Sequence, residues 1–211
     1  MRLRLFLSAV LGLAFAGMPA LADQYTFTID HCTGGCGTAP FGSVNVTQNG
    51  SNTVNVSVSL TSGDGFVSTG FPGSFAFDII GNPTISVSSL PSGWSLVSTA
   101  AGNLQFDGFG NLDYALVCDV CAPGGNHPSS LSFDVTATGL TPASFAELSR
   151  IPPGSEQGYF VADIMGTTGN TGIVGATLLS RTTAPEPSTV LLLGTGGLFV
   201  AFSSFRRRRK A

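Results

Sequence analysis

The sequence predicts an all-β protein, a β-sandwich of jelly-roll-like strand order, with an N-terminal signal helix before it and a C-terminal transmembrane helix after it. Short stretches that alternate apolar and polar residues recur along the chain, and Gly, Pro and Asn separate them. Charged residues make up 10% of the 211 residues, against about 25% in ordinary soluble proteins. Phenylalanine and aliphatic residues are spread along the whole chain, so a core can form.

The clearest alternation lies in SVNVTQNGSNTVNVSVSL, residues 43–60. Val44 and Val46 alternate with polar residues before Asn49-Gly50, and valines at every second position follow it. Arms of period two around Asn-Gly are typical of a β-hairpin with one face in the core.

Similar patterns predict further strands over 25–29, 74–80, 84–90, 103–109, 112–118, 130–138, 158–164 and 172–179. One helix is expected over 141–149, with Thr141 as N-cap and Pro142 at the first helical position. About ten short strands indicate a two-sheet sandwich, which we place at residues 23–181.

The N-terminus has the parts of a secretory signal. Arg2 and Arg4 precede the apolar run 5–17, and the small residues of Ala-Leu-Ala, 20–22, form a cleavage site. We therefore expect a signal peptide over 1–22 and a mature chain that begins near Asp23.

The other end has the parts of a membrane anchor. Residues 188–205 carry no charge and would span about 27 Å as a helix, enough for a bilayer core. A basic tail, 206–211, follows with Arg206, Arg207, Arg208, Arg209 and Lys210. Such residues stay on the cytoplasmic side and stop transfer, so the body is expected outside the inner membrane.

A linker over 182–187 places Pro185, Glu186 and Pro187 before Ser188 and the apolar segment. This order, Pro-Glu-Pro, span, basic cluster and chain end, resembles the PEP-CTERM sorting tail of Gram-negative bacteria, over about the last 27 residues. The resemblance implies processing by an exosortase-type membrane protease, and delivery to the cell surface or the exopolysaccharide matrix. The alternative is a permanent single-span anchor, in which the prolines only end the helix.

The body is acidic. Residues 23–184 hold eleven acidic groups and two basic ones, Arg150 and Arg181, a net charge of nine negatives. Nucleic acid is therefore not expected as a partner, because phosphate contacts need Lys and Arg. Weak Ca²⁺ binding is one reading of this charge, and a solubilising surface is the preferred one.

Four cysteines form two short-spaced pairs, Cys32 with Cys36 and Cys118 with Cys121, near His31 and His127. An exported chain with an even cysteine count predicts disulfides. We prefer the two local bridges, and cross-pairing stays open because spacing does not determine connectivity. The alternative is a Cys₄ zinc site with the histidines nearby.

No motif for catalysis is present, neither G-x-S-x-G nor H-E-x-x-H. We expect no catalytic residue, metal or cofactor, and favour a structural or interaction protein over a glycan-binding module and, third, a hydrolase. Trp94 could stack on a sugar, but a core position is preferred. The stretch from Asp107 to Asp113 resembles a Ca²⁺ loop only in part, and a hairpin turn is the better interpretation.

Overall fold

The computed structural model describes residues 21–70, 72–98, 103–122, 125–150 and 156–182. Leu21–Thr182 form one compact unit, the body of the chain. Its strands are β1 (Ala22–Cys32), β2 (Gly42–Gln48), β3 (Thr53–Leu60), β4 (Gly65–Phe66), β5 (Phe75–Phe77), β6 (Ser86–Ser88), β7 (Trp94–Ser98), β8 (Leu104–Phe106), β9 (Gly110–Leu112), β10 (Tyr114–Cys118), β11 (Ser130–Thr136), β12 (Phe160–Met165) and β13 (Thr171–Thr182). Two 3₁₀ turns, η1 (Asp119–Cys121) and η2 (Pro142–Phe145), complete the described elements.

The expected all-β class is confirmed, but the two expected sheets are two halves of one antiparallel sheet. Its strand order is β6-β11-β3-β2-β1-β13-β12-β5-β10-β7, and β4 pairs with β12. The halves meet at the long pair β1–β13, where the register shifts twice, between Gln24 and Tyr25 and between Phe27 and Ile29. Such bulges increase the local twist and bend of a strand.

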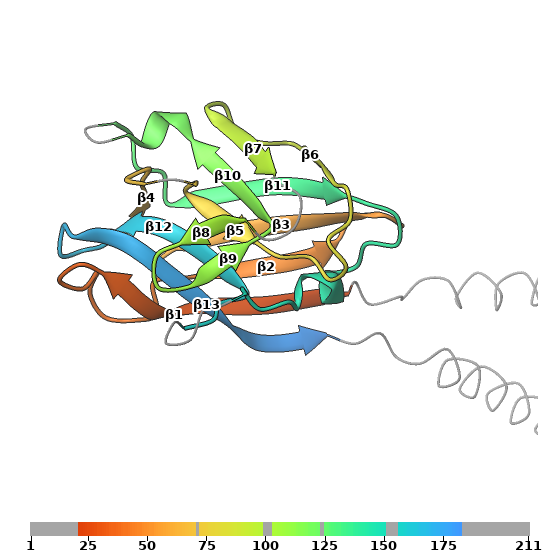
Figure 1. The fold of residues 1–211 in the computed structure, drawn as a ribbon, viewed down its shortest axis with the longest axis horizontal. Coiled ribbons are helices and arrows are strands. Elements are labelled where there is room, and N and C mark those ends of the chain that lie inside the picture. The colour runs from red at the N-terminus through yellow and green to blue at the C-terminus, as the bar shows by residue number, and fades with distance from the viewer. Residues whose placement is uncertain (1–20, 71, 99–102, 123–124, 151–155, 183–211) are drawn as a thin grey trace, which may run out of the picture. The chain divides into compact units, whose positions relative to one another are not determined.

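The sheet folds over on itself and encloses its own core. Phe133 on β11 lies 6.0 Å from Phe75 and 5.9 Å from Phe77, both on β5, measured between ring centroids. Five strands separate β11 from β5 along the sheet, so these contacts are made across the layers, which overlap in the view of Figure 1. The observed order differs from a jelly-roll-like one, because β1, β2 and β3 pair side by side as a simple meander.

The predicted hairpin forms as expected. β2 pairs antiparallel with β3, from Gly42 opposite Leu60 to Gln48 opposite Val54. The valines of both strands are buried in the main core. Gly50 in the turn has a φ of 123°, a conformation that glycine adopts without strain.

A second, smaller core lies on the outer face of the sheet. The hairpin β8–β9 packs there, and its Leu104, Phe106, Phe109 and Leu112 are buried with Ala76, Ala115 and Val161 of the sheet. The hairpin appears in front of β5 and β12 in Figure 1. As a result, β12 is covered on both faces.

Three short strands, β4, β7 and β9, were not among those predicted. The expected helix over 141–149 is only the 3₁₀ turn η2, although Thr141 is its N-cap and Pro142 its first residue. Within the described ranges, no helix has the length and apolar composition to cross a membrane. Nearly all of the expected signal segment, and the whole expected span 188–205, lie outside the described residues.

Candidate functional site

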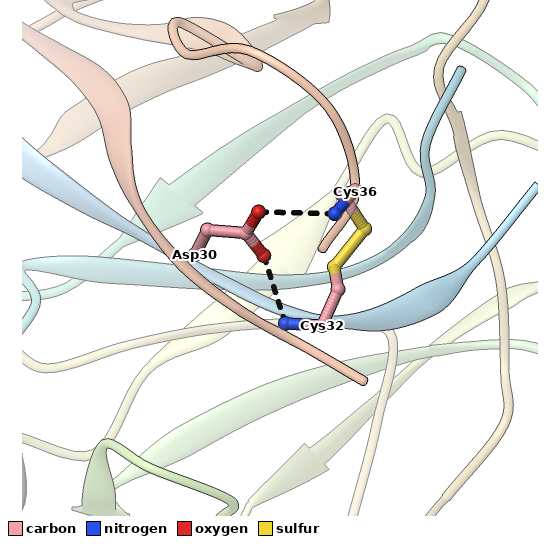
Figure 2. A group of neighbouring side chains, drawn as sticks. All are labelled: Asp30, Cys32 and Cys36. Atoms are coloured by element: carbon pink, nitrogen blue, oxygen red, sulfur yellow. Dashed lines mark hydrogen bonds between the residues drawn. A yellow bond between two sulfur atoms is a disulfide. The ribbon is translucent and has the colours of Figure 1, made fainter. Parts of the chain in front are cut away.

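The first chemical feature of the body is the loop that follows β1. Cys32 and Cys36 are joined by a disulfide, and Asp30 closes the same loop from inside (Figure 2). The Asp30 carboxylate accepts hydrogen bonds from the backbone N–H of Cys32 at 2.8 Å and of Cys36 at 3.0 Å. Gly34 and Gly35 between the cysteines have φ of 84° and 81°, which side-chain-bearing residues rarely adopt.

Asp30, Cys32 and Cys36 are also the one group of potential metal ligands that lie within 4.8 Å of one another in the described part of the chain. Metal ligation by cysteine needs a free thiolate, and here the two sulfurs are bonded to each other. The carboxylate already caps two N–H groups. The geometry is therefore that of a stapled loop, and it does not fit a metal centre.

The second cysteine pair is also local, Cys118 with Cys121. The preferred pairing is thus the one that the structure has, and it leaves no sulfur for a Cys₄ zinc site. The two histidines make other contacts. His127 Nδ1 is 3.2 Å from the carbonyl oxygen of Phe66, and the His31 ring packs edge-on against Phe109 at 4.9 Å.

A polar pocket of about 250 Å³ opens beside the first loop. It lies between the end of β1, residues Thr69, Gly70 and Gly73, the tip of the β8–β9 hairpin, β12 and the start of β13. Its polar side chains are those of His31, Thr33, Thr69, Asp107, Asp163 and Thr171.

Asp163 is the most buried polar group of this pocket, with 1% of its surface exposed. Its Oδ2 accepts hydrogen bonds from the N–H of Thr69 at 2.8 Å and from its hydroxyl at 2.7 Å. Burial raises the pKa of the Asp163 carboxyl, and the bonds from Thr69 act in the opposite direction. Sequence reasoning missed this residue, because the segments that enclose it, Thr69 and the β8–β9 hairpin, come from distant parts of the chain.

His31 forms one wall of the pocket. Its Nε2 lies 3.6 Å from Oε2 of the exposed Glu156. The His31 ring also lies close to Gly108 at the hairpin tip. A Cβ at Gly108 would lie 2.3 Å from Nδ1 of His31, and the φ of Gly108 is 79°, so a glycine is needed there. Hydroxyl, carboxyl and imidazole groups thus face one hollow, and no Lys or Arg is among the described residues that line it.

Trp94 lies in the core, as expected from the sequence. It is 8% exposed, and its ring packs edge-on against Phe66 at 5.3 Å. The large apolar residues that are exposed in the described ranges are Ile80, Val120, Leu148 and Leu179, none of them aromatic. The stretch from Asp107 begins a hairpin turn, as predicted, between β8 and β9.

Residues 183–209 match the PEP-CTERM protein-sorting motif. The PEP-CTERM match contains Pro185, Glu186, Pro187 and Ser188 and the arginines Arg206–Arg209, and it ends one residue before Lys210. All of these residues lie outside the described ranges. Neither the curated proteins nor the solved structures contain a match to the chain.

The PEP-CTERM motif marks a protein that is exported, held in the membrane as a precursor, processed by exosortase and then presented outside the cell. It follows directly on β13, whose Thr182 pairs with Ala22 at the start of β1. Both ends of the body thus lie side by side (Figure 1). At the other end of this strand pair, Cys32 faces Gly172, so the stapled loop and the pocket lie away from the point where the tail begins.

Proposed function

We propose that this chain is a structural or interaction protein of the cell surface or extracellular matrix, with a role in exopolysaccharide or biofilm and without catalytic activity. The sorting motif at residues 183–209 carries the proposal. The nature of the body supports it. Its cysteines staple loops, its single Trp is in the core, and its net charge of nine negatives disfavours nucleic acid.

The sorting step is tested by Glu186→Ala in a host that has the protease. We expect full-length protein to accumulate in the inner membrane, because the topology survives and cleavage fails. Blots of fractionated cells measure this. Glu156→Ala, the same change at an exposed glutamate of the body, is the matched control and should mature normally. If Glu186→Ala reaches the surface as the wild type does, the tail is a plain anchor.

A second candidate function, glycan binding, rests on the polar pocket. Its hydroxyl and carboxyl groups can hydrogen-bond sugar hydroxyls, and it lies at the end of the β1–β13 pair where Cys32 faces Gly172. The exposed aromatic platform that such modules commonly use is missing from the described part of the body. The structural role therefore stands first.

A glycan array with the exported protein separates the two. Gly70 lines the pocket, and a Cβ there meets nothing within 4 Å, so Gly70→Leu places an apolar side chain at the pocket wall and should block binding. Ser51→Leu in the exposed β2–β3 turn is the matched control. Binding that only Gly70→Leu abolishes would favour the glycan module, whereas release of cleaved sugar would favour the hydrolase that we placed third.

A further inference from the structure

Two buried aspartates lie next to each other where β5 ends and β10 begins. Asp78 is 1% exposed and Asp113 is 0% exposed. The backbone N–H of Asp113 donates to Oδ1 of Asp78 at 2.5 Å. Glu147 and Arg150, from the segment after η2, complete the group: Nη2 of Arg150 is 3.2 Å from Oδ2 of Asp113 and 3.8 Å from Oε1 of Glu147. We call these four residues the acid cluster.

The acid cluster has too few donors for its acceptors. One guanidinium faces three carboxyl groups, so the fully ionised cluster has two net negative charges. Three buried oxygens, Asp78 Oδ2, Asp113 Oδ1 and Glu147 Oε2, accept no hydrogen bond from the described residues. Unsatisfied buried acceptors destabilise a fold, and a proton would turn one of them into a donor.

Asp78 is the group that takes this proton. Burial raises the pKa of its carboxyl to about 7, and the charges of Asp113 and Glu147 act in the same direction. The N–H of Asp113 and the charge of Arg150 oppose the rise without cancelling it. Tyr114 on β10 faces the same charges, and burial followed by the three carboxylates raises its pKa to about 12. Tyr114 therefore stays protonated and donates to Oδ1 of Asn82 at 2.7 Å.

The acid cluster ties three segments together. Asp113 follows β9 directly, so it is attached to the β8–β9 hairpin. Asn111 in β9 and Arg150 exchange two backbone hydrogen bonds, of 2.8 and 2.9 Å. Through Asp78, both segments are held to the end of β5. The hairpin in turn carries Asp107, which lines the polar pocket.

We propose that the acid cluster is a proton-operated latch, which holds the end of the β8–β9 hairpin against the sheet while Asp78 is protonated and weakens when Asp78 ionises. The direction follows from linkage. The closed state binds a proton more tightly than an open state in which Asp78 reaches water, where its pKa is 3.8. The opening constant therefore rises about tenfold per pH unit from about pH 4 to about pH 7, and is level above that. The apolar side chains of the hairpin pack against the sheet whether Asp78 is protonated or ionised. The proton therefore changes how often the hairpin opens, and it is not the only interaction that keeps the hairpin closed.

Hydrogen exchange of the exported protein tests the latch. After correction for intrinsic rates, we expect amides of residues 104–113 to open about 50-fold more often at about pH 7 than at about pH 5. Asp78→Asn should remove this dependence, since its side chain cannot ionise. Asp119→Asn, at an exposed aspartate, is the matched control and should keep the wild-type profile. An Asp78→Asn protein that retains the full dependence would overturn the latch.

A direct titration keeps the proposal testable if Asp78→Asn does not fold. The ¹³C shift of the Asp78 carboxyl should titrate with a midpoint near pH 7, because its pKa is raised to about 7. Glu147→Gln should move that midpoint to lower pH, because it removes a negative neighbour, and Arg150→Gln should move it to higher pH. A midpoint below about 5, close to that of ordinary aspartates, would contradict the latch. An unchanged midpoint in both variants would contradict the influence of Glu147 and Arg150 on the Asp78 carboxyl.

Discussion

Replacing Gly175 by Ala should force the second core apart at one defined contact. Gly175 lies in the middle of β13, directly beneath the fully buried ring of Phe109. A Cβ at this position would lie 2.1 Å from Cε1 and 2.5 Å from Cζ of that ring. Carbon atoms in contact are normally about 3.5–4.0 Å apart, so the ring has to move by more than about 1 Å.

The structure also indicates how large the effect is. Overpacking a well-packed core costs about 1–3 kcal/mol, and Phe109 has little room, since Leu104, Phe106 and Leu112 surround it in the same cluster. We expect a loss near the upper end of that range. Phe109→Ala alone should cost about 3–5 kcal/mol, because it leaves a cavity.

The double variant is the decisive measurement. The three atoms nearest to the new methyl group all belong to the Phe109 ring, so without the ring the closest contacts are gone and the methyl group fills part of the cavity. Gly175→Ala with Phe109→Ala should therefore be about as stable as Phe109→Ala alone, with a coupling of at least about 1 kcal/mol. Urea unfolding, followed by the fluorescence of the single Trp, gives each free energy. Gly70→Ala, where a Cβ meets nothing, is the control and should be neutral or slightly stabilising. Additive losses, within about 0.5 kcal/mol, would refute the clash.

Three further predictions concern the cysteines and the tail. A non-reduced digest of the exported protein should show no free thiol by mass spectrometry, and four alkylatable thiols together with bound zinc would reverse the disulfide assignment. Cys36→Ser should lower the free energy of unfolding by about 2 kcal/mol, the loop-closure entropy of so short a bridge; urea unfolding measures it, and an unchanged midpoint would show that the loop needs no staple. Replacing residues 206–210 by Ser removes five charges that each oppose membrane passage by about 2.5–3.5 kcal/mol. The precursor should then leave the inner membrane unprocessed in fractionation blots, whereas normal retention would locate the stop signal elsewhere.

The β2–β3 hairpin and the sorting tail could be predicted because their signals are local. Alternating valines around Asn49-Gly50 specify two strands and their turn within eighteen residues. The tail motif consists of adjacent segments in a fixed order. In both cases nothing distant in the sequence has to be known.

The path of the sheet could not be predicted in the same way. Its central pair joins Ala22 to Thr182, from opposite ends of the body, and no local pattern specifies such a partner. The short strands β4 and β9 have only two and three residues, too few to show a period. The polar pocket and the acid cluster depend on the same long-range pairing, so Asp163 and Asp78 stood out only in the structure.

Charge limits which matrix polymer the body can contact. Seven of the nine basic residues lie in the expected signal peptide and basic tail, so cleavage at both ends changes a chain of net charge −3 into a body of net charge −9. Like charges repel most when salt is low. The processed protein should therefore not bind a polyuronate at low ionic strength in a co-sedimentation assay, while a neutral polysaccharide meets no such barrier. The unprocessed precursor in detergent, which keeps its arginines, is the control and should bind the polyuronate in a salt-sensitive way. Tight binding of polyuronate by the processed body, lost on adding salt, would show that two arginines suffice and that net charge does not govern this contact.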